Sequence, residues 1–272
     1  TALVNRYMQE TPVAACLVTA GWDDAAHFQD PKFREEVEAQ IPAHELKMRT
    51  EGIPLMGSGL VYPFQTDDLA IQPFELPRHF PRIAAIDWGQ DHKAAVVVMA
   101  FNVETDEEYA YKAEAKSNLT LSEFANLVKR SVGKSNQWIP VVWPHDVNKR
   151  DARSGETLRN LFVEEGVNMM TTHFTNPPGP GKGEGQGGNS VEAGLIALRD
   201  KMGMDQFKVF ATCEDWFREQ QIYHRKDGKV VSQLDDLMDA TRYASMMRRH
   251  AALPPTPQRL FTKRRSRGSN WG

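Results

Sequence analysis

Three short apolar segments follow one another between residues 82 and 115, with only a few residues between them. They span residues 82–88, 93–101 and 109–115, and the second connection reads NVETDEE. Connections this short join antiparallel neighbours, because a parallel pair needs a crossover of a dozen or more residues. The sequence therefore predicts a three-stranded antiparallel meander.

After the meander, helical and strand patterns alternate. Residues 117–132 have Ser and Thr in capping positions and apolar residues at helical spacing, and residues 156–165 repeat that spacing. Apolar segments at 138–144 and 167–174 read as strands. Connections of helix length indicate parallel pairing, so we expect an α/β fold with one mixed central sheet flanked by helices.

The C-terminal half begins with a Gly-rich loop and continues with further helices and strands. The expected elements are a loop at 175–189, a helix at 190–202, a strand at 207–211, a helix at 213–223, a small hairpin around Asp227 and Gly228, and a last helix at 235–249.

Composition excludes several classes of protein. The chain has 272 residues, of which 40% are hydrophobic and 25% charged, as in ordinary globular proteins. It contains no apolar run of 18 residues, so no membrane-spanning segment is predicted. Cys16 and Cys213 lie far apart without a CxxC motif, which argues against a disulfide framework or a structural zinc site. A soluble intracellular protein is expected.

Charge and proline content divide the chain into three expected parts. Residues 1–80 are expected to be the end of a domain whose beginning is absent, residues 81–249 form the main domain, and residues 250–272 form a basic tail. The net charge is −3, and the chain from Arg248 onward has seven basic residues and no acidic ones, so residues 1–247 carry −10. The tail is either flexible and solvated or a docking segment for acidic groups.

Carboxylates stand at the ends of two expected strands and at the start of the last helix. Asp87 ends the first strand, Asp146 follows the strand at 138–144, and Asp236 and Asp239 share one helix face beside Asp235. Carboxylates gathered at one point repel one another unless a divalent cation neutralises them, and oxygen ligands favour magnesium or manganese. Each Asp alone is more simply a turn former or helix cap.

Three short motifs in this order resemble the nuclease domain of phage terminase large subunits. They are IDWGQD on the first strand, VVWPHD on the strand at 138–144 and DDLMDATRYA on the last helix. The resemblance covers nearly the whole chain. It implies an RNase H-like fold of the resolvase type, and residues 1–80 are similar to the end of the terminase ATPase domain and its linker.

The resemblance also implies roles for individual residues. Asp87 would be the central ligand that bridges two metal ions, and Asp146 the second ligand. Asp236 and Asp239 are equal candidates for the third, with Asp235 as their neighbour at the start of the helix. Asp91 matches an accessory acid of the family.

Three basic residues follow Asp146 closely. Lys149, Arg150 and Arg153 are candidates to hold DNA phosphates, and a solvated basic loop is the equally simple alternative.

The resemblance implies a magnesium- or manganese-dependent endonuclease of a phage DNA-packaging motor. It would cleave concatemeric double-stranded DNA with two metal ions in the host cytoplasm. Its expected partners are double-stranded DNA, the portal protein of the procapsid and the small terminase subunit, with no membrane involved. No GxxxxGK[ST] motif occurs in the chain, so no ATPase activity is expected from it.

Two other functions stay open from the sequence. The first is an actin-like or sugar-kinase-like phosphotransferase, which also begins with a strand ending in Asp and Gly but needs a second glycine-rich phosphate loop. The second is a non-catalytic DNA- or portal-binding module on an RNase H-like scaffold, in which the carboxylates are structural.

Overall fold

The computed structural model describes most of the chain from residue 59 to residue 255 and short stretches before it. The described residues are 20–25, 28, 30–38, 41, 50, 59–89, 93–144, 156–183, 185–226, 229–231 and 234–255. Their helices and 3-10 turns are η1 (Trp22–Asp24), α2 (Pro31–Glu38), α4 (Thr66–Leu69), α5 (Leu121–Val132), η4 (Lys134–Asn136), α6 (Leu158–Glu164), α7 (Val191–Gly203), α8 (Glu214–Ile222), α9 (Asp236–Met246) and η6 (Arg248–His250). Their strands are β1 (Ala70–Ile71), β2 (Arg82–Asp87), β3 (Ala94–Asn102), β4 (Glu107–Lys116), β5 (Val141–Val142), β6 (Phe207–Phe210), β7 (Arg225–Lys226) and β8 (Lys229–Val230).

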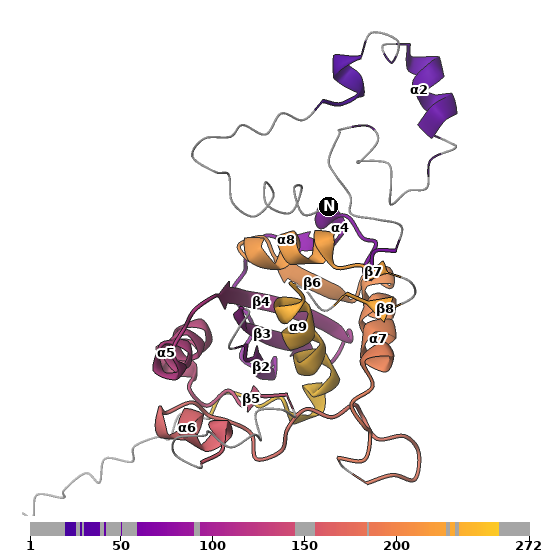
Figure 1. Ribbon diagram of the computed structural model, residues 1–272. Coiled ribbons are helices and arrows are strands. Elements are labelled where there is room, and N and C mark those ends of the chain that lie inside the picture. The colour runs from indigo at the N-terminus through magenta and orange to yellow at the C-terminus, as the bar shows by residue number, and fades with distance from the viewer. Residues whose placement is uncertain are drawn as a thin grey trace, which may run out of the picture.

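One six-stranded mixed sheet organises the domain (Figure 1). Its strand order is β1-β6-β4-β3-β2-β5, and β7 and β8 form a separate antiparallel pair. Strands β2, β3 and β4 are antiparallel neighbours, which confirms the predicted meander. Strand β5 joins β2 in parallel, and β6 joins β4 in parallel, as expected for connections of helix length.

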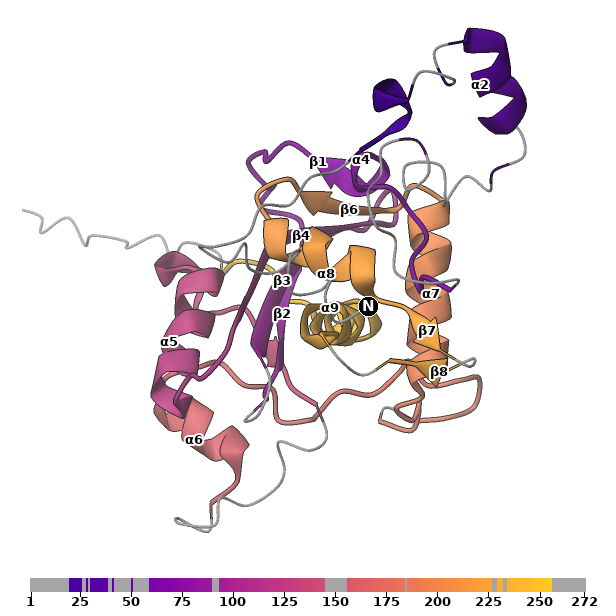
Figure 2. The same cartoon turned by 45° about the horizontal axis from the view of Figure 1, so that its top comes forward.

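Helices cover both faces of the sheet, and the alternation of side chains along β2 divides the core in two. Ile83 and Ala85 belong to the cluster on the α9 face, whereas Ala84 and Ile86 belong to the cluster on the α5 face. Figure 2 shows α5 on one side of the strands and α9 on the other. Both faces of β2 and β3 are therefore buried, as in strands at the middle of a layered sheet.

Helix α5 begins at a capping threonine and ends at a glycine. The Thr120 side chain accepts a hydrogen bond from the Glu123 backbone N–H, and Glu123 Oε2 accepts one from the Thr120 backbone N–H at 2.8 Å, which forms a capping box. Gly133 ends the helix with φ of 93°, a conformation that residues with a Cβ rarely adopt. These signals fix where the helix begins and ends.

The segment before β2 belongs to the same sheet and core. Strand β1 pairs with β6, and Tyr62 and Leu69 are buried in the α9-side cluster. Gln220 Nε2 donates to the Tyr62 carbonyl at 2.7 Å, and the Val61 N–H donates to the Tyr223 carbonyl at 3.0 Å. The sequence did not predict β1, because two residues are too few to show a strand pattern. The division of the chain into domains at residue 80 stays a prediction, although the sheet includes residues from before it.

Two predicted strands are wrong in length or type. Only Val141 and Val142 of the segment 138–144 form a strand, and residues 167–174 make an isolated bridge at Met169 instead of a strand. The apolar pattern of the second segment arises from burial of single side chains against the core, including Val167, which needs no continuous pairing.

The last predicted helix is divided in two. Helix α9 ends at Met246, and the separate 3-10 turn η6 follows it. The other predicted helices and β6 are confirmed within a few residues, and the β7–β8 pair is where the hairpin was expected.

The basic C-terminal stretch is anchored where it leaves α9. Arg248 donates to Glu108 at 3.1 Å, and Ala252 exchanges backbone hydrogen bonds with Arg82 at 2.9 and 2.8 Å. Residues 256–272 and the turn at Asp227 and Gly228 lie outside the described residues.

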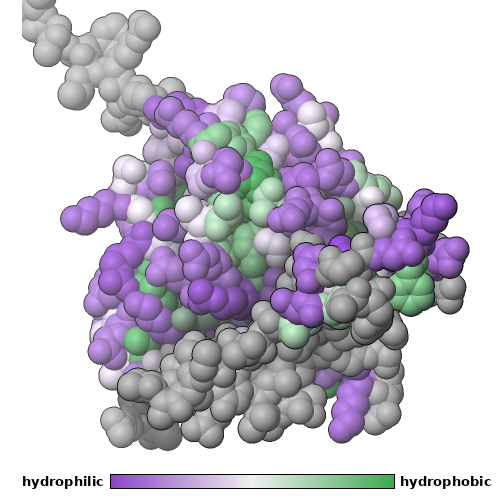
Figure 3. Space-filling view, turned by 90° about the horizontal axis from the view of Figure 1, so that it is seen from above, coloured by the Kyte–Doolittle hydropathy of each residue, from purple (hydrophilic) through white to green (hydrophobic). Residues whose placement is uncertain are grey.

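The described surface seen from above is mostly hydrophilic, with a strip of hydrophobic residues near the centre and smaller hydrophobic areas toward the left and right (Figure 3). Among the described helices, none is both long and apolar enough to cross a bilayer.

Candidate functional site

Asp87 is the last residue of β2 and lies on the α9 face of the sheet. The alternation that places Ile83 and Ala85 in the α9-side cluster continues to Asp87, and its side chain is half-buried. Because β5 runs parallel to β2 as its neighbour, the chain beyond Val142 leaves the sheet at the edge where Asp87 stands. Two strand ends that the sequence singled out therefore meet at one edge.

Helix α9 packs across this face and brings Asp239 toward Asp87. Tyr243, one helical turn after Asp239, donates its hydroxyl to Asp239 Oδ2 at 3.1 Å. The pKa of Tyr243 is raised chiefly by burial and further by the negative charges of Asp239 and Asp87. Asp87 and Asp239 are 152 positions apart in the sequence, and both carboxylates lie near the Tyr243 hydroxyl.

Arg242 holds the other oxygen of Asp239. Arg242 Nη2 and Nε donate to Asp239 Oδ1 at 3.1 and 3.3 Å, and the Arg242 side chain is only 2% exposed. Its guanidinium lies 5.1 Å from the ring centre of Phe174 and 4.7 Å from that of Tyr243. Burial is the largest single influence and lowers the pKa of Arg242, but the charge and hydrogen bond of Asp239, together with Tyr243 and Tyr223, outweigh it and the pKa is raised. The Asp239 carboxylate is therefore fixed in one orientation.

The absence of a side chain on Gly194 makes room for Arg242. A Cβ at this position of α7 would lie 2.7 Å from Cγ and Cδ of Arg242. Nearby, the hydroxyls of Tyr62 and Tyr223 and the Arg242 Nη1 atom are buried without a hydrogen-bond partner within the described part of the chain. Arg242 also influences the pKa of Tyr62 and Tyr223, both of which are raised chiefly by burial. Residues from segments far apart in the sequence therefore lie around Arg242.

Asp236 faces a different neighbour from Asp239. It is 3% exposed, and its charge raises the pKa of Glu219 on α8, which burial raises most and Asp235 raises further. Glu219 Oε1 accepts the Met238 backbone N–H at 2.9 Å and so caps the start of α9. Asp235 occupies the N-cap position of α9. These contacts favour Asp239 over Asp236 as the partner of Asp87.

Several predicted site residues lie outside the described residues. These are Asp91, Asp146, Lys149, Arg150 and Arg153. Among the residues that the structure does describe, no group of three His, Cys, Asp or Glu side chains is arranged to hold a metal ion. The described chain thus supplies a pair of carboxylates, Asp87 and Asp239, at one end of the sheet.

Four residues of this region were not foreseen. Tyr62, Glu219, Arg242 and Tyr243 contact or neighbour the carboxylates. Arg242 and Tyr243 stand three and four positions after Asp239 in the sequence, which places them on its helix face, so their spacing was a usable signal. Tyr62 and Glu219 come from distant segments, and nothing in their local sequence marks them.

Comparison with known proteins identifies relatives along most of the chain. The model of the Terminase RNaseH-like domain matches residues 84–248. The terminase large subunit of Salmonella phage P22 is 37% identical over 252 residues, which cover 92% of this chain and 48% of that protein. The terminase large subunit of Enterobacteria phage LP7 is 37% identical over 246 residues, which cover 90% of this chain and 49% of that protein. The chain spans about half the length of these curated relatives.

Solved structures agree with the fold. The nuclease domain of the P22 large terminase has 39% sequence identity and a TM-score of 0.63, and the match covers 73% of this chain and 96% of that chain. The large terminase of a thermophilic bacteriophage is 15% identical with a TM-score of 0.51 over 81% of this chain and 53% of that chain, and it supports the fold alone. The central mixed sheet is thus RNase H-like. The chain belongs to the family of the terminase RNaseH-like domain, the nuclease domain of terminase large subunits.

Proposed function

We propose that this domain is a metal-dependent endonuclease of a phage DNA-packaging motor, which cleaves concatemeric double-stranded DNA. The observation that supports this most is that Asp87 on β2 and Asp239 on α9 both lie near the Tyr243 hydroxyl, which donates to Asp239 and whose pKa both negative charges raise. Two carboxylates fixed at the end of an RNase H-like sheet have the chemistry of a hard-cation site. The name of the P22 nuclease domain, to which the chain is similar, agrees with this activity.

The proposed ligands are Asp87, Asp239 and Asp146, with Asp236, Asp235 and Asp91 as further candidates. Magnesium or manganese suits this oxygen-only set, and a pair of such ions, when bound, would activate a water molecule and stabilise the leaving oxygen of a phosphodiester. Arg242 and Tyr243 keep Asp239 from rotating, because each donates to a different oxygen of its carboxylate. Lys149, Arg150 and Arg153 are proposed to contact DNA phosphates.

The wider biological setting is also a proposal, because the chain covers only about half of its curated relatives. We expect the portal protein of the procapsid and the small terminase subunit as partners and the host cytoplasm as the location. The ATPase activity of a packaging motor would reside outside this chain.

A nicking assay tests the proposed activity. Supercoiled plasmid is incubated with manganese and with the wild-type protein, Asp87→Asn or Asp200→Asn, where Asp200 is an exposed residue on α7. We expect Asp87→Asn to lower the cleavage rate more than about 100-fold, because loss of even a residue that only supports a metal ligand costs about 10- to 100-fold. Asp200→Asn should cleave as the wild type does. Equal cleavage by the wild type and Asp87→Asn would refute the assignment.

The ion pair between Asp239 and the buried Arg242 favours one alternative. In it, the domain binds DNA or the portal protein without cleaving, and Asp239 serves only as the ion-pair partner of Arg242. The same assay separates the two functions, because the alternative predicts no nicking by any of the three proteins.

A further inference from the structure

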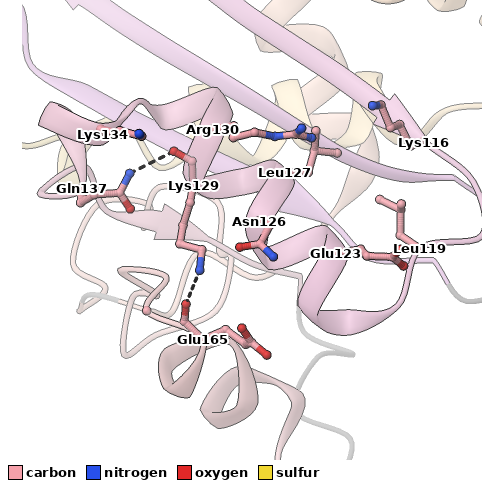
Figure 4. Close-up of a pocket in the computed structure, with 11 residues that line it drawn as sticks. Lys116, Leu119, Glu123, Asn126, Leu127, Lys129, Arg130, Lys134, Gln137 and Glu165 are labelled. Atoms are coloured by element: carbon pink, nitrogen blue, oxygen red, sulfur yellow. Dashed lines mark hydrogen bonds between the residues drawn. The ribbon is translucent and has the colours of Figure 1, made fainter.

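A groove of about 820 Å³ runs along the outer face of α5 and is not part of the carboxylate site (Figure 4). It is bounded by the end of β4, by α5 and η4, and by the end of α6. Its charged lining residues are Lys116, Glu123, Lys129, Arg130, Lys134 and Glu165. Four cations and two carboxylates give the groove a net positive charge in a chain whose overall charge is −3.

The carboxylates of the groove are engaged in holding the fold. Glu123 accepts the backbone N–H of Thr120 at 2.8 Å and the Thr120 hydroxyl at 2.7 Å. Glu165 accepts the Ser122 hydroxyl, and its backbone carbonyl accepts Lys129 Nζ at 2.7 Å. Both carboxylates thus accept hydrogen bonds from neighbouring residues.

The charges of the other three cations are not neutralised within the described part of the chain. Lys116, Arg130 and Lys134 are exposed, and their side chains make no hydrogen bond or ion pair with any residue in the described ranges. Arg130 and Lys134 are four positions apart, at the end of α5 and in the turn that follows it. Cations that neutralise nothing within the protein are available to an anionic partner.

One end of this groove lies at the sheet edge where Asp87 stands, although α5 covers the face opposite to that of Asp87. Lys116 pairs with Ala94 of β3, and Asp87 pairs with the adjacent Ala95. Lys116 and Asp87 therefore end two strands at the same edge, separated by one strand, or about 10 Å at the usual strand spacing. The groove then follows α5, whose 12 residues span about 18 Å.

We propose that this α5 groove binds the phosphate backbone of duplex DNA whose cleaved bond lies at the Asp87 edge. The inference rests on the proposed nuclease function and names the surface that would hold the substrate beside the site. A polyanion fits cations distributed along about 18 Å better than a single small anion does, and one turn of duplex, about 34 Å, is long enough to reach from the groove to the site. Contacts of this kind position the duplex without reading its sequence.

Fluorescence anisotropy with a labelled 30-base-pair duplex in EDTA tests the proposal over a range of salt concentrations. The variant is the triple substitution Lys116→Gln, Arg130→Gln and Lys134→Gln. The matched control replaces three exposed cations of α7 and the β7–β8 pair with Gln, namely Arg199, Lys226 and Lys229. Both variants lose three positive charges, so a difference between them reports location and not net charge.

We expect the groove variant to bind about 500-fold more weakly at 0.1 M salt, and its slope of log K against log salt to be smaller by about 2.7, because each lost phosphate contact removes about 0.9. The control should keep the slope of the wild type. Equal slopes in all three proteins, or equal losses in both variants, would overturn the proposal. Because binding is measured without metal, a wild-type protein that fails to nick plasmid would refute the proposed nuclease and leave this result standing.

Discussion

Replacing Arg242 with methionine should destabilise the domain and should do so mainly through Asp239. The Arg242 side chain is 2% exposed and that of Asp239 is 20% exposed, so the ion pair is mostly hidden from water. Removing one partner of a buried pair costs about 3–5 kcal/mol, and the partial exposure of Asp239 places the expected loss near the lower end, at about 3 kcal/mol. Methionine keeps an apolar stem against Phe174, so little of the loss comes from a cavity.

A double-mutant cycle with Arg242→Met and Asp239→Asn isolates the pair. Each single variant leaves one charge without its partner, whereas the double variant leaves neither, so we expect a coupling energy of about 1.5–3 kcal/mol from urea unfolding. Arg218 and Asp215 on α8 provide the control, because they have the same three-residue spacing and a 2.9 Å contact but are 62% and 51% exposed. Their coupling should stay below about 1 kcal/mol. Additivity within about 0.5 kcal/mol at Arg242 and Asp239 would refute this reasoning.

Three further predictions concern stability. Gly194→Ala should lower the free energy of unfolding by about 1–3 kcal/mol, because its Cβ would meet Arg242. Gly203→Ala should lower it by less than about 0.5 kcal/mol, because the nearest atom to its Cβ would be 3.8 Å away, and thermal unfolding compares the two variants. The pKa of Glu219 is raised, so its contribution to the free energy of unfolding is full below about pH 4 and is lost as the pH rises. The free energy of unfolding of Glu219→Gln in urea should therefore increase relative to that of the wild type from about pH 4 to about pH 8, and a constant difference would contradict this. Thr120→Ala should cost about 1 kcal/mol by removing the α5 cap, and an unchanged unfolding midpoint would argue against that cap.

The sequence predicted those parts of the fold that local signals determine. Short connections identified the meander of β2, β3 and β4, and Ser and Thr capping residues with helical spacing identified α5 within a few residues. The sequence did not predict strand β1, and it predicted a strand where Met169 makes only an isolated bridge. Both depend on pairing partners far away in the chain. An apolar pattern reports burial, and burial alone does not separate a strand from an irregular segment packed on one.

The candidate site was predictable in part for the same reason. The position of Asp87 at the end of a strand was visible in the sequence, and so was the helix face of Asp236 and Asp239. The choice between these two acids depends on which face of α9 meets β2, which the sequence left open. In the structure, Tyr243 and Arg242 fix Asp239 toward Asp87, and Glu219 occupies the side of Asp236.

Metal-dependent cleavage at this site requires that carboxylates from β2 and α9 hold a common cation or two neighbouring ones. Anomalous diffraction from crystals soaked in manganese tests this requirement, with a difference map calculated at the manganese absorption edge. We predict a peak within about 2.0–2.4 Å of an oxygen of Asp87, with Asp239 as a second ligand of the same ion or of a neighbouring one. Manganese bound elsewhere with no peak at Asp87, or a peak at Asp87 with α9 contributing no ligand, would contradict the proposed site.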